Sequence, residues 1–327
     1  MKNAIKRAAL CLLNWAPIYR VLRRRALKDS PLTVLCYHTL RPDDEPLDAW
    51  LALRLGDFRR QVETLRRHYD IVSLDAGLSP AAPGSRPRVV LTFDDGEVGL
   101  YSHLLPFIEA EKLPVTIYVA TSQIEAGQPY WFDRVMNGLQ GNGPIRINLQ
   151  ADGLAAWTVG PERGKARWQA IGDILQALKD MPPPERDRLA DAIVGQAGPI
   201  IDSFTPLAPM TIPQLQKLAS NPLVTIGAHS HCHNLLDQIP LAQARTSIAQ
   251  SRNLLKEWTG QEVRHFAYPN GNYIPELMAE IADLGFVSAS ILGDRLAPSG
   301  VDPFALPRIG VGRYDVLHRF RLRLVGV

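Results

Sequence analysis

Two clusters of acidic and histidine residues are the groups in this sequence best suited to chemistry. The adjacent pair Asp94 and Asp95 ends an apolar run at residues 89–93, and His229 and His233 follow a second apolar run. Carboxylate and imidazole groups together are typical metal ligands. An Asp-Gly sequence alone fits a polar turn equally well. Carboxylates beside a hydrophobic core are costly without a cation, and the second segment, with two histidines four residues apart, favours a metal site.

Composition and length restrict the class of protein. The chain has 327 residues, 46% of them apolar and 21% charged, which is ordinary for a folded soluble protein and long enough for one α/β barrel. Its three cysteines form no Cys-x-x-Cys pair, which argues against a disulfide framework and fits a reducing compartment.

The first 30 residues form a basic segment. Eight basic residues there accompany one acidic residue, a net charge of +7, whereas the whole chain carries +3, so the remainder sums to −4. The apolar stretch at residues 8–16 is too short to span a bilayer, and no small-residue cleavage site follows it. We predict peripheral contact of residues 1–28 with an anionic membrane, the alternative being a basic helix packed on the barrel.

Strand-like and helix-like segments alternate along the rest of the chain, which predicts parallel βα units. The strand-like runs are at residues 32–38, 69–74, 89–93, 115–120, 223–228, 263–268 and 286–291. A mainly helical insertion interrupts this rhythm at about residues 125–215, with a small hairpin near residues 145–154. We therefore expect a basic segment at residues 1–30 and one barrel domain at residues 31–327.

Polar residues follow four of these predicted strands. His38, Asp94 with Asp95, His229 and Tyr268 each come at a carboxyl end. In a βα barrel these ends open on one face, where active sites lie.

Three motifs together resemble the polysaccharide deacetylase family, which is carbohydrate esterase family 4 and contains the nodulation-type chitooligosaccharide deacetylase homology domain. The motifs are Thr92-Phe-Asp-Asp-Gly96, His229-Ser-x-x-His233 and Arg264-x-Phe-x-Tyr-Pro-x-Gly271, in the family's usual order. The resemblance implies a distorted (β/α)7 barrel that removes N-acetyl groups from amino sugars with a metal. Tyr37-His38 and Leu306-Pro-Arg308 resemble a subgroup encoded with bacterial surface-glycan genes.

The resemblance implies that Asp95, His229 and His233 bind one divalent metal ion. Two histidines and one carboxylate leave positions open for water and substrate, and suit Zn²⁺ best, with Co, Ni or Fe as alternatives. The spacing of four residues predicts both imidazoles on one face of a helical turn.

The remaining roles follow from the same resemblance. Asp94 is the expected general base, and Arg264 the arginine that pairs with it. The backbone N–H of Tyr268 is the expected donor to the oxyanion, since Pro269 has no N–H. Pro269 and Trp131 are assigned to substrate binding, although Trp131 fits a buried aromatic residue as well.

Two departures from the family pattern matter. The sequence has no clear Asp-x-x-x-Trp motif, and Leu306-Pro-Arg308 carries arginine where the family has its acid histidine. We therefore predict that His38 is the general acid, the alternative being a proton supplied by water.

These features predict a metal-dependent sugar N-deacetylase of bacterial glycan assembly. Its expected partner is an acetylated glycan or glycolipid, with no nucleic acid, and its expected place is the cytoplasm at the inner membrane. Export with an uncleaved N-terminal anchor is the alternative. The alternative functions are an O-acetyl esterase or a deformylase on the same barrel, or a non-catalytic glycan-binding protein.

Overall fold

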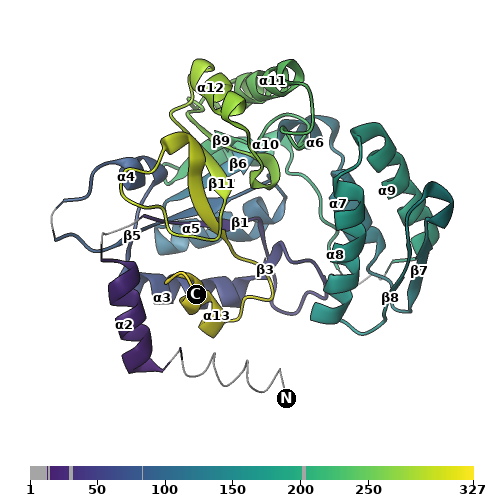
Figure 1. Ribbon diagram of the computed structural model, residues 1–327, viewed down its shortest axis with the longest axis horizontal. Coiled ribbons are helices and arrows are strands. Elements are labelled where there is room, and N and C mark those ends of the chain that lie inside the picture. Colours follow the sequence, from purple (N-terminus) through teal and green to yellow (C-terminus); the bar gives the residue numbers. More distant parts are fainter. Residues whose placement is uncertain (1–12, 14, 29–31, 83, 201–203) are drawn as a thin grey trace.

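Seven parallel strands form a closed barrel in the computed structural model, which describes residue 13 and residues 15–28, 32–82, 84–200 and 204–327 (Figure 1). Strands that follow one another along the chain are neighbours in the barrel, and β1 closes the ring by pairing with both β12 and β5. The predicted (β/α)7 barrel is confirmed. Its strands are β1 (Thr33–Tyr37), β5 (Arg88–Phe93), β6 (Val115–Val119), β9 (Val224–Ala228), β10 (His265–Ala267), β11 (Ser288–Leu292) and β12 (Leu306–Gly310).

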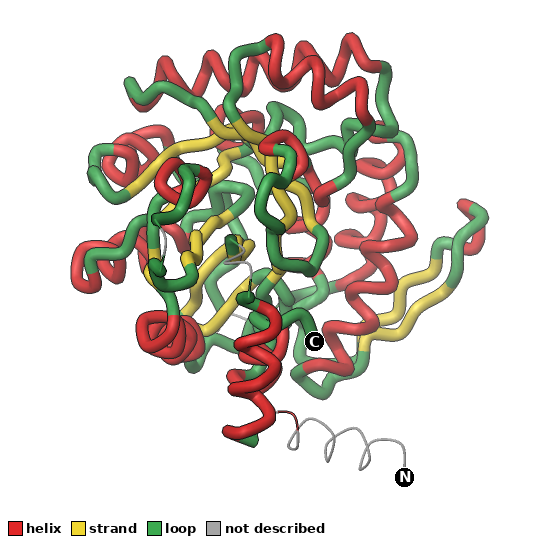
Figure 2. The backbone as a smooth tube through the Cα atoms, turned by 60° about the vertical axis from the view of Figure 1, so that its left-hand side comes forward, coloured by secondary structure: helices red, strands yellow, loops and turns green. Residues whose placement is uncertain are grey.

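Helices surround the strands (Figure 2). They are α3 (Leu55–His68), α4 (Leu74–Leu78), the π-helical turn η1 (Leu100–Leu104) that continues into α5 (Leu105–Glu111), α10 (Ile212–Ala219), α11 (Leu241–Thr259), α12 (Pro275–Asp283) and α13 (Leu317–Arg323). Short elements complete the body: β2 (Thr39–Arg41), β3 (Ala52–Arg54), β4 (Asp70–Ile71) and the 3-10 turns η3 (Pro269–Gly271) and η4 (Pro303–Ala305). The strand predicted at residues 69–74 is reduced to β4, because the chain enters α4 at Leu74.

Successive residues of each barrel strand point alternately toward the surrounding helices and into the barrel interior, and both faces are buried. Residues such as Leu35 and Leu91 face outward into the core between strands and helices. Val34 and Val90 face inward, where they form a separate core with Tyr118. Because successive strand residues point to opposite faces, the inward positions nearer the carboxyl ends are Cys36, Thr92, Asp94 and Arg308. Polar groups thus replace apolar ones as the barrel interior approaches its open end.

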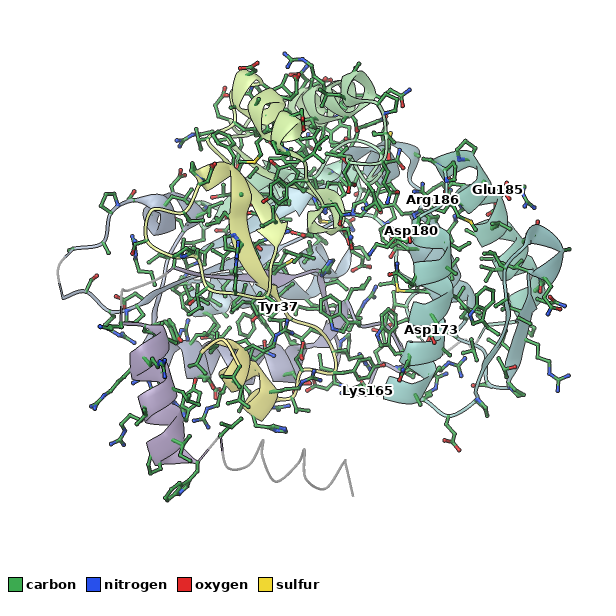
Figure 3. All side chains as sticks on the ribbon, in the orientation of Figure 1. Tyr37, Lys165, Asp173, Asp180, Glu185 and Arg186 are labelled. Carbon is green, nitrogen blue, oxygen red and sulfur yellow. The ribbon has the colours of Figure 1, made fainter. Side chains whose placement is uncertain are left out.

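The insertion lies between β6 and β9, and its apolar core also includes Leu47, Ala49 and Ala52 from the segment that leads into and begins β3. Its elements are α6 (Thr121–Ala126), α7 (Trp131–Gly138), β7 (Ile145–Asn148), the 3-10 turn η2 (Gln150–Asp152), β8 (Ala156–Val159), α8 (Lys165–Lys179) and α9 (Pro183–Ala197). Figure 3 marks Lys165 and Asp180 toward opposite ends of α8, beside the barrel. The hairpin forms, but its second strand begins at Ala156, beyond the predicted residues 145–154, because η2 lengthens the connection.

The described part of the basic segment is the helix α2 (Ala16–Ala26). Tyr19 is buried against Leu322 and Val325, and its hydroxyl donates to the Arg321 carbonyl at 3.1 Å. Trp15 is 62% exposed. Residues 1–12, 14 and 29–30 of the predicted segment lie outside the described residues. Among the described helices, none is both long and apolar enough to cross a membrane.

Candidate active site

The three predicted metal ligands meet at the carboxyl end of the barrel. Asp95 follows β5, and His229 and His233 follow β9. The prediction of a helical turn is wrong, because Ser230 and His233 adopt positive φ angles of 63° and 53° and form a tight loop. The Ser230 hydroxyl holds this loop by accepting the His233 N–H at 3.1 Å. Asp95 has a φ of 76°, so the ligand loops store backbone strain of the kind found at functional sites.

The geometry of these side chains fits a divalent metal. Asp95 Oδ1 lies 3.5 Å from His229 Nε2 and 3.2 Å from His233 Nε2. Ligands about 2.1 Å from a tetrahedral Zn²⁺ lie roughly 3.4 Å apart. Asp95 Oδ1 is buried and accepts no hydrogen bond within the described chain. The other ring nitrogen of His229 lies 2.8 Å from the Ala267 carbonyl, which orients Nε2 as in metal-binding histidines. Asp95, His229 and His233 therefore fit a divalent metal ion.

The local electrostatics also favour a cation. Burial disfavours the charged form of Asp95, but its contacts with His229 and His233 outweigh burial and hold its pKa well below the usual range. Burial likewise opposes protonation of His229, and the nearby carboxylates Asp94 and Asp95 outweigh it and raise its pKa. In His233 burial dominates, so its pKa is lowered. Asp95 is thus ionised, as a metal ligand must be.

Asp94 is held by a buried arginine that was not predicted as its partner. The Arg308 Nη1 and Nη2 atoms each donate to one oxygen of Asp94 at 2.7 Å. Arg308 is fully buried with its guanidinium 5.2 Å from the Tyr118 ring, and a side chain at Gly227 would collide with that ring. Burial opposes ionisation of Asp94, but Arg308 and His229 outweigh it and lower its pKa. Asp94 is therefore an ionised carboxylate in a fixed orientation.

Arg264 does not reach Asp94, so that prediction is wrong. It precedes β10, and its side chain is 52% exposed and lies 3.3 Å from Asp75. β10 runs from this end of the barrel toward the open face, so Arg264 lies at the amino end of the strands, away from the metal ligands. Arg308 takes its place because it points into the barrel from β12 and reaches Asp94 across the interior.

Tyr268 and Pro269 do not take the predicted positions either. The Tyr268 N–H donates to the Ser290 carbonyl at 3.0 Å, so it is used by the pairing between strands and is not free for an oxyanion. Its ring packs outward with Phe266. Pro269 is buried, and among the described residues neither it nor Tyr268 lines the cavity at the metal ligands.

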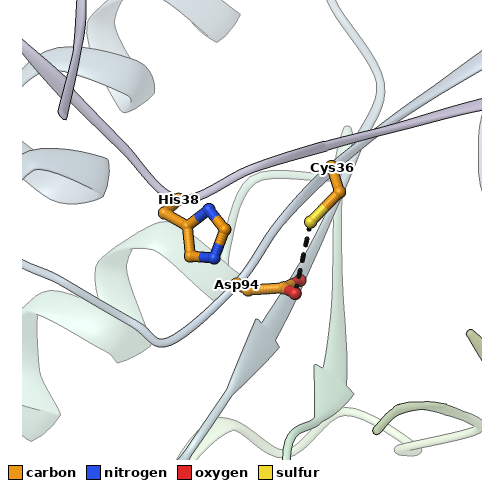
Figure 4. A group of neighbouring side chains, drawn as sticks. All are labelled: Cys36, His38 and Asp94. Carbon is orange, nitrogen blue, oxygen red and sulfur yellow. Dashed lines mark hydrogen bonds between the residues drawn. The ribbon is translucent and has the colours of Figure 1, made fainter. Parts of the chain in front are cut away.

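His38 lies where the prediction placed it, at the end of β1 beside Asp94 (Figure 4). Its Nδ1 atom is buried without a hydrogen-bond partner among the described residues, and its ring lies 5.6 Å from that of Trp50. Glycine at position 312 makes room for the Trp50 indole, which a side chain there would strike. Cys36 donates to Asp94 Oδ2 at 3.3 Å, and burial raises the pKa of its thiol well above the usual range. The thiol is thus a neutral donor to the carboxylate.

Trp131 lies in the wall of the cavity, as its assignment to substrate binding requires. The cavity has a volume of about 330 Å³ and separates the barrel mouth from the insertion. The cavity residues absent from the sequence-based prediction include Trp50, Trp168, Lys179 and Arg186. On α8 the residues Trp168, Gly172, Leu175 and Lys179 recur at helical spacing, which in sequence is the same as the pattern of a core-facing helix.

Comparisons with known proteins agree with this fold. The family described as polysaccharide deacetylase matches residues 81–151 and 200–289, on either side of most of the insertion. No curated protein sequence matches the chain significantly. The matched segments contain Asp94, Asp95, His229 and His233, whereas His38 and Arg308 lie outside both.

Solved structures show the same fold at low identity. The Streptococcus pyogenes deacetylase PplD, determined in complex with acetate, is 16% identical with a TM-score of 0.59, and the match covers 90% of this chain and 98% of PplD. IcaB from Ammonifex degensii is 17% identical with a TM-score of 0.58, covering 90% and 97%. A de-N-acetylase from Aggregatibacter actinomycetemcomitans is 14% identical with a TM-score of 0.54, covering 89% and 99%. The family match, the shared motifs and the closed barrel together show that this chain carries a polysaccharide deacetylase domain, which is a hydrolase domain, at residues 81–151 and 200–289.

Proposed function

We propose that this glycan deacetylase is metal-dependent and removes N-acetyl groups from amino sugars of a bacterial exopolysaccharide, surface polysaccharide or lipid-linked precursor. The observation that carries the proposal is the buried, unpartnered Asp95 Oδ1, which faces two imidazoles beside an oriented Asp94. A divalent ion bound by Asp95, His229 and His233 would polarise the acetyl carbonyl and acidify the attacking water. Zn²⁺ suits this ligand set best.

The chain's own residues supply the proton transfers. Asp94 accepts the proton of the attacking water, and the two Arg308 contacts at 2.7 Å keep its carboxylate ionised and fixed. His38 donates a proton to the departing amine, which is a poor leaving group unless protonated. Both residues line the cavity together with the metal ligands, so the acid and the base act on one bound acetamido group.

The oxyanion donor requires a new assignment, because the Tyr268 N–H is already used. Pro269 has no N–H, so Asn270 is the next residue with a backbone donor. Asn270 lines the cavity and adopts a φ of 58°, which turns the chain sharply at this point. We assign the oxyanion contact to the Asn270 backbone N–H.

The activity and its metal dependence have a direct test. Purified protein supplied with Zn²⁺ or Co²⁺ should contain one ion per chain and should release acetate from an N-acetylated amino-sugar oligosaccharide. A chelator should abolish the release, and returning the metal should restore it. Release that survives complete metal removal contradicts the metal site, and an O-acetylated oligosaccharide as sole substrate would identify an esterase.

We propose further that α2 brings the protein to the cytoplasmic face of an anionic membrane. Tyr19 fixes the helix on α13, which supports the packed-helix alternative for one face. The opposite face is free within the described chain: Val21 is 65% exposed, and Arg20 and Arg24 are exposed beside it. Basic groups beside exposed apolar side chains bind anionic bilayer surfaces.

Neutralising Arg20 and Arg24 together, by Arg20→Gln and Arg24→Gln, should weaken binding to anionic liposomes about 30-fold, since each basic residue contributes roughly 1 kcal/mol. The matched control neutralises two exposed lysines on α10 and α11, Lys217→Gln and Lys256→Gln, and should bind like the wild type. Sedimentation with liposomes measures both. Equal loss in the two variants would refute a membrane role for α2.

A further inference from the structure

The side of the cavity formed by the insertion carries positive charge. Lys179 ends α8. Arg186 lies in the first turns of α9 (Figure 3). Both residues line the cavity that contains the catalytic groups. The remaining insertion residues in the wall are mostly aromatic or apolar: Trp131, Phe132, Met136, Trp168, Gly172, Leu175 and Gln176.

Arg186 is built into this wall. Its side chain is only 7% exposed, and its guanidinium carbon lies 5.2 Å from the Trp131 ring. One guanidinium nitrogen donates to Asn234 Oδ1 at 3.1 Å. Arg186 also contacts Asp187 at 3.3 Å, but the Asp187 side chain is 49% exposed and does not line the cavity. An arginine stacked on an aromatic face presents its planar donors in a fixed direction.

Lys179 reaches from α8 to the barrel loop that follows β10. Its ammonium group donates to the Asn270 side-chain oxygen, so it is tied to the loop assigned above to the oxyanion. Burial lowers the pKa of Lys179, against the opposing effect of Asp180. A neutral oxygen is a weak partner for a partly desolvated ammonium group, which leaves the charge available to an anion.

The acidic groups of the cavity do not balance these two cations. Among the described lining residues, only Asp94 and Asp95 are acidic. Asp94 is paired with Arg308, and Asp95 belongs to the metal ligands. With a divalent ion bound, the cavity therefore carries a net positive charge. With a neutral sugar bound, Lys179 would face no anion in the cavity, and Arg186 would keep only its ion pair with the half-exposed Asp187 outside the cavity. Partly buried cations with so little compensation are unfavourable.

We propose that Lys179 and Arg186 form an anion-binding subsite, so that the substrate amino sugar carries an anionic group, a phosphate or a carboxylate, close to its acetamido group. The inference rests on the proposed deacetylation, whose acetamido group must reach Asp94 and His38 in the same cavity. Arginine and lysine are the residues that bind phosphate and carboxylate oxygens best. The Trp131 ring beside Arg186 offers a face for the sugar. A cavity of about 330 Å³ is at the small end for ligand sites, which keeps the anion close to the reacting group.

Binding measurements test this inference without turnover. The titrations use zinc-loaded Asp94→Asn protein and follow heat on adding N-acetylglucosamine 1-phosphate, N-acetylglucosaminuronic acid or the neutral methyl glycoside of N-acetylglucosamine. We expect one of the anionic sugars to bind at least about 10-fold more tightly than the neutral one, the size of one charge-assisted contact. The phosphate and carboxylate ligands show which anion the subsite prefers.

Variants separate the subsite from direct binding of the anion to the metal. Lys179→Gln or Arg186→Gln should remove most of the anionic preference while affinity for the neutral sugar stays the same. Lys165→Gln is the matched control, because Lys165 is an exposed lysine near the other end of α8 (Figure 3). If Arg186→Gln does not fold, the affinities of Lys179→Gln alone decide whether the subsite causes the preference for anionic sugars.

Equal affinity for neutral and anionic sugars, or an anionic preference that Lys179→Gln leaves intact, would overturn the subsite. The acetate assay is independent of this result. If the protein releases acetate from neutral oligosaccharides and shows no preference for anionic sugars, the anion-binding subsite is refuted and the proposed deacetylation stands. If the protein prefers anionic sugars but releases acetate from none of the ligands, the subsite is supported and the proposed reaction is refuted.

Discussion

Asp94→Asn should retain the metal and lose most turnover. An asparagine cannot accept the proton of the attacking water, and general-base catalysis contributes on the order of 10²–10⁴-fold. The substitution also leaves Arg308 with a neutral partner, so the thermal midpoint should fall, and turnover must be measured well below it. Acetate release per metal-loaded chain is the measurement. A variant with bound metal and near-wild-type turnover would show that Asp94 is not the base.

Comparing His38→Gln with Asp94→Asn on an amide and an ester substrate distinguishes the role of general acid from that of general base. It should slow amide hydrolysis about 10²-fold or more with metal retained, because the amine departs only when protonated. An acetyl ester with a good leaving group needs no such proton, so the loss should shrink on that substrate. Asp94→Asn should slow both substrates, since both need an activated water. Equal losses for His38→Gln on the two substrates, or loss of metal, would contradict its role as acid.

The fold could be predicted from sequence because each βα unit carries its own local signals. Apolar runs bounded by turn residues predicted six of the seven barrel strands, and the loss of the strand–helix alternation marked the insertion. The carboxyl ends of parallel strands share one face, so a residue just past a strand end can be placed without further information. His38, Asp94, Asp95 and His229 are all of this kind.

The partner of Asp94 could not be predicted in the same way. Strands of a closed barrel are buried on both faces, so their sequences lack the alternation that reveals which residues point inward. All five residues of β12 are buried, and Leu306-Pro-Arg308 reads the same in either register. Tyr268 was a candidate through its backbone N–H, and only the pairing of β10 with β11 shows that this N–H already donates to the Ser290 carbonyl. The resemblance to the family motif suggested Arg264 as the partner of Asp94. Only the position of β12 in the barrel identifies Arg308 as that partner.

The Asp94–Arg308 pair should therefore contribute both to stability and to catalysis. Arg308→Gln removes the positive partner of a carboxylate that is 3% exposed, and breaking such a buried pair costs about 3–5 kcal/mol. Arg308→Lys keeps the charge but loses the two parallel contacts, so it should fold while its turnover falls, because Asp94 is no longer held in one orientation. Denaturant unfolding and acetate release measure the two effects.

Arg264→Gln provides the matched control on the family's motif arginine. Its side chain is half exposed, and its ion pair with Asp75 joins two side chains of similar exposure, so the unfolding free energy should change by less than about 1 kcal/mol. Turnover should stay near the wild-type value because no described contact links Arg264 to the cavity. A large loss of turnover in Arg264→Gln, with Arg308→Lys unaffected, would return the pairing role to Arg264. The opposite result would mean that the inward register of β12, and not the motif, decides which arginine serves the base.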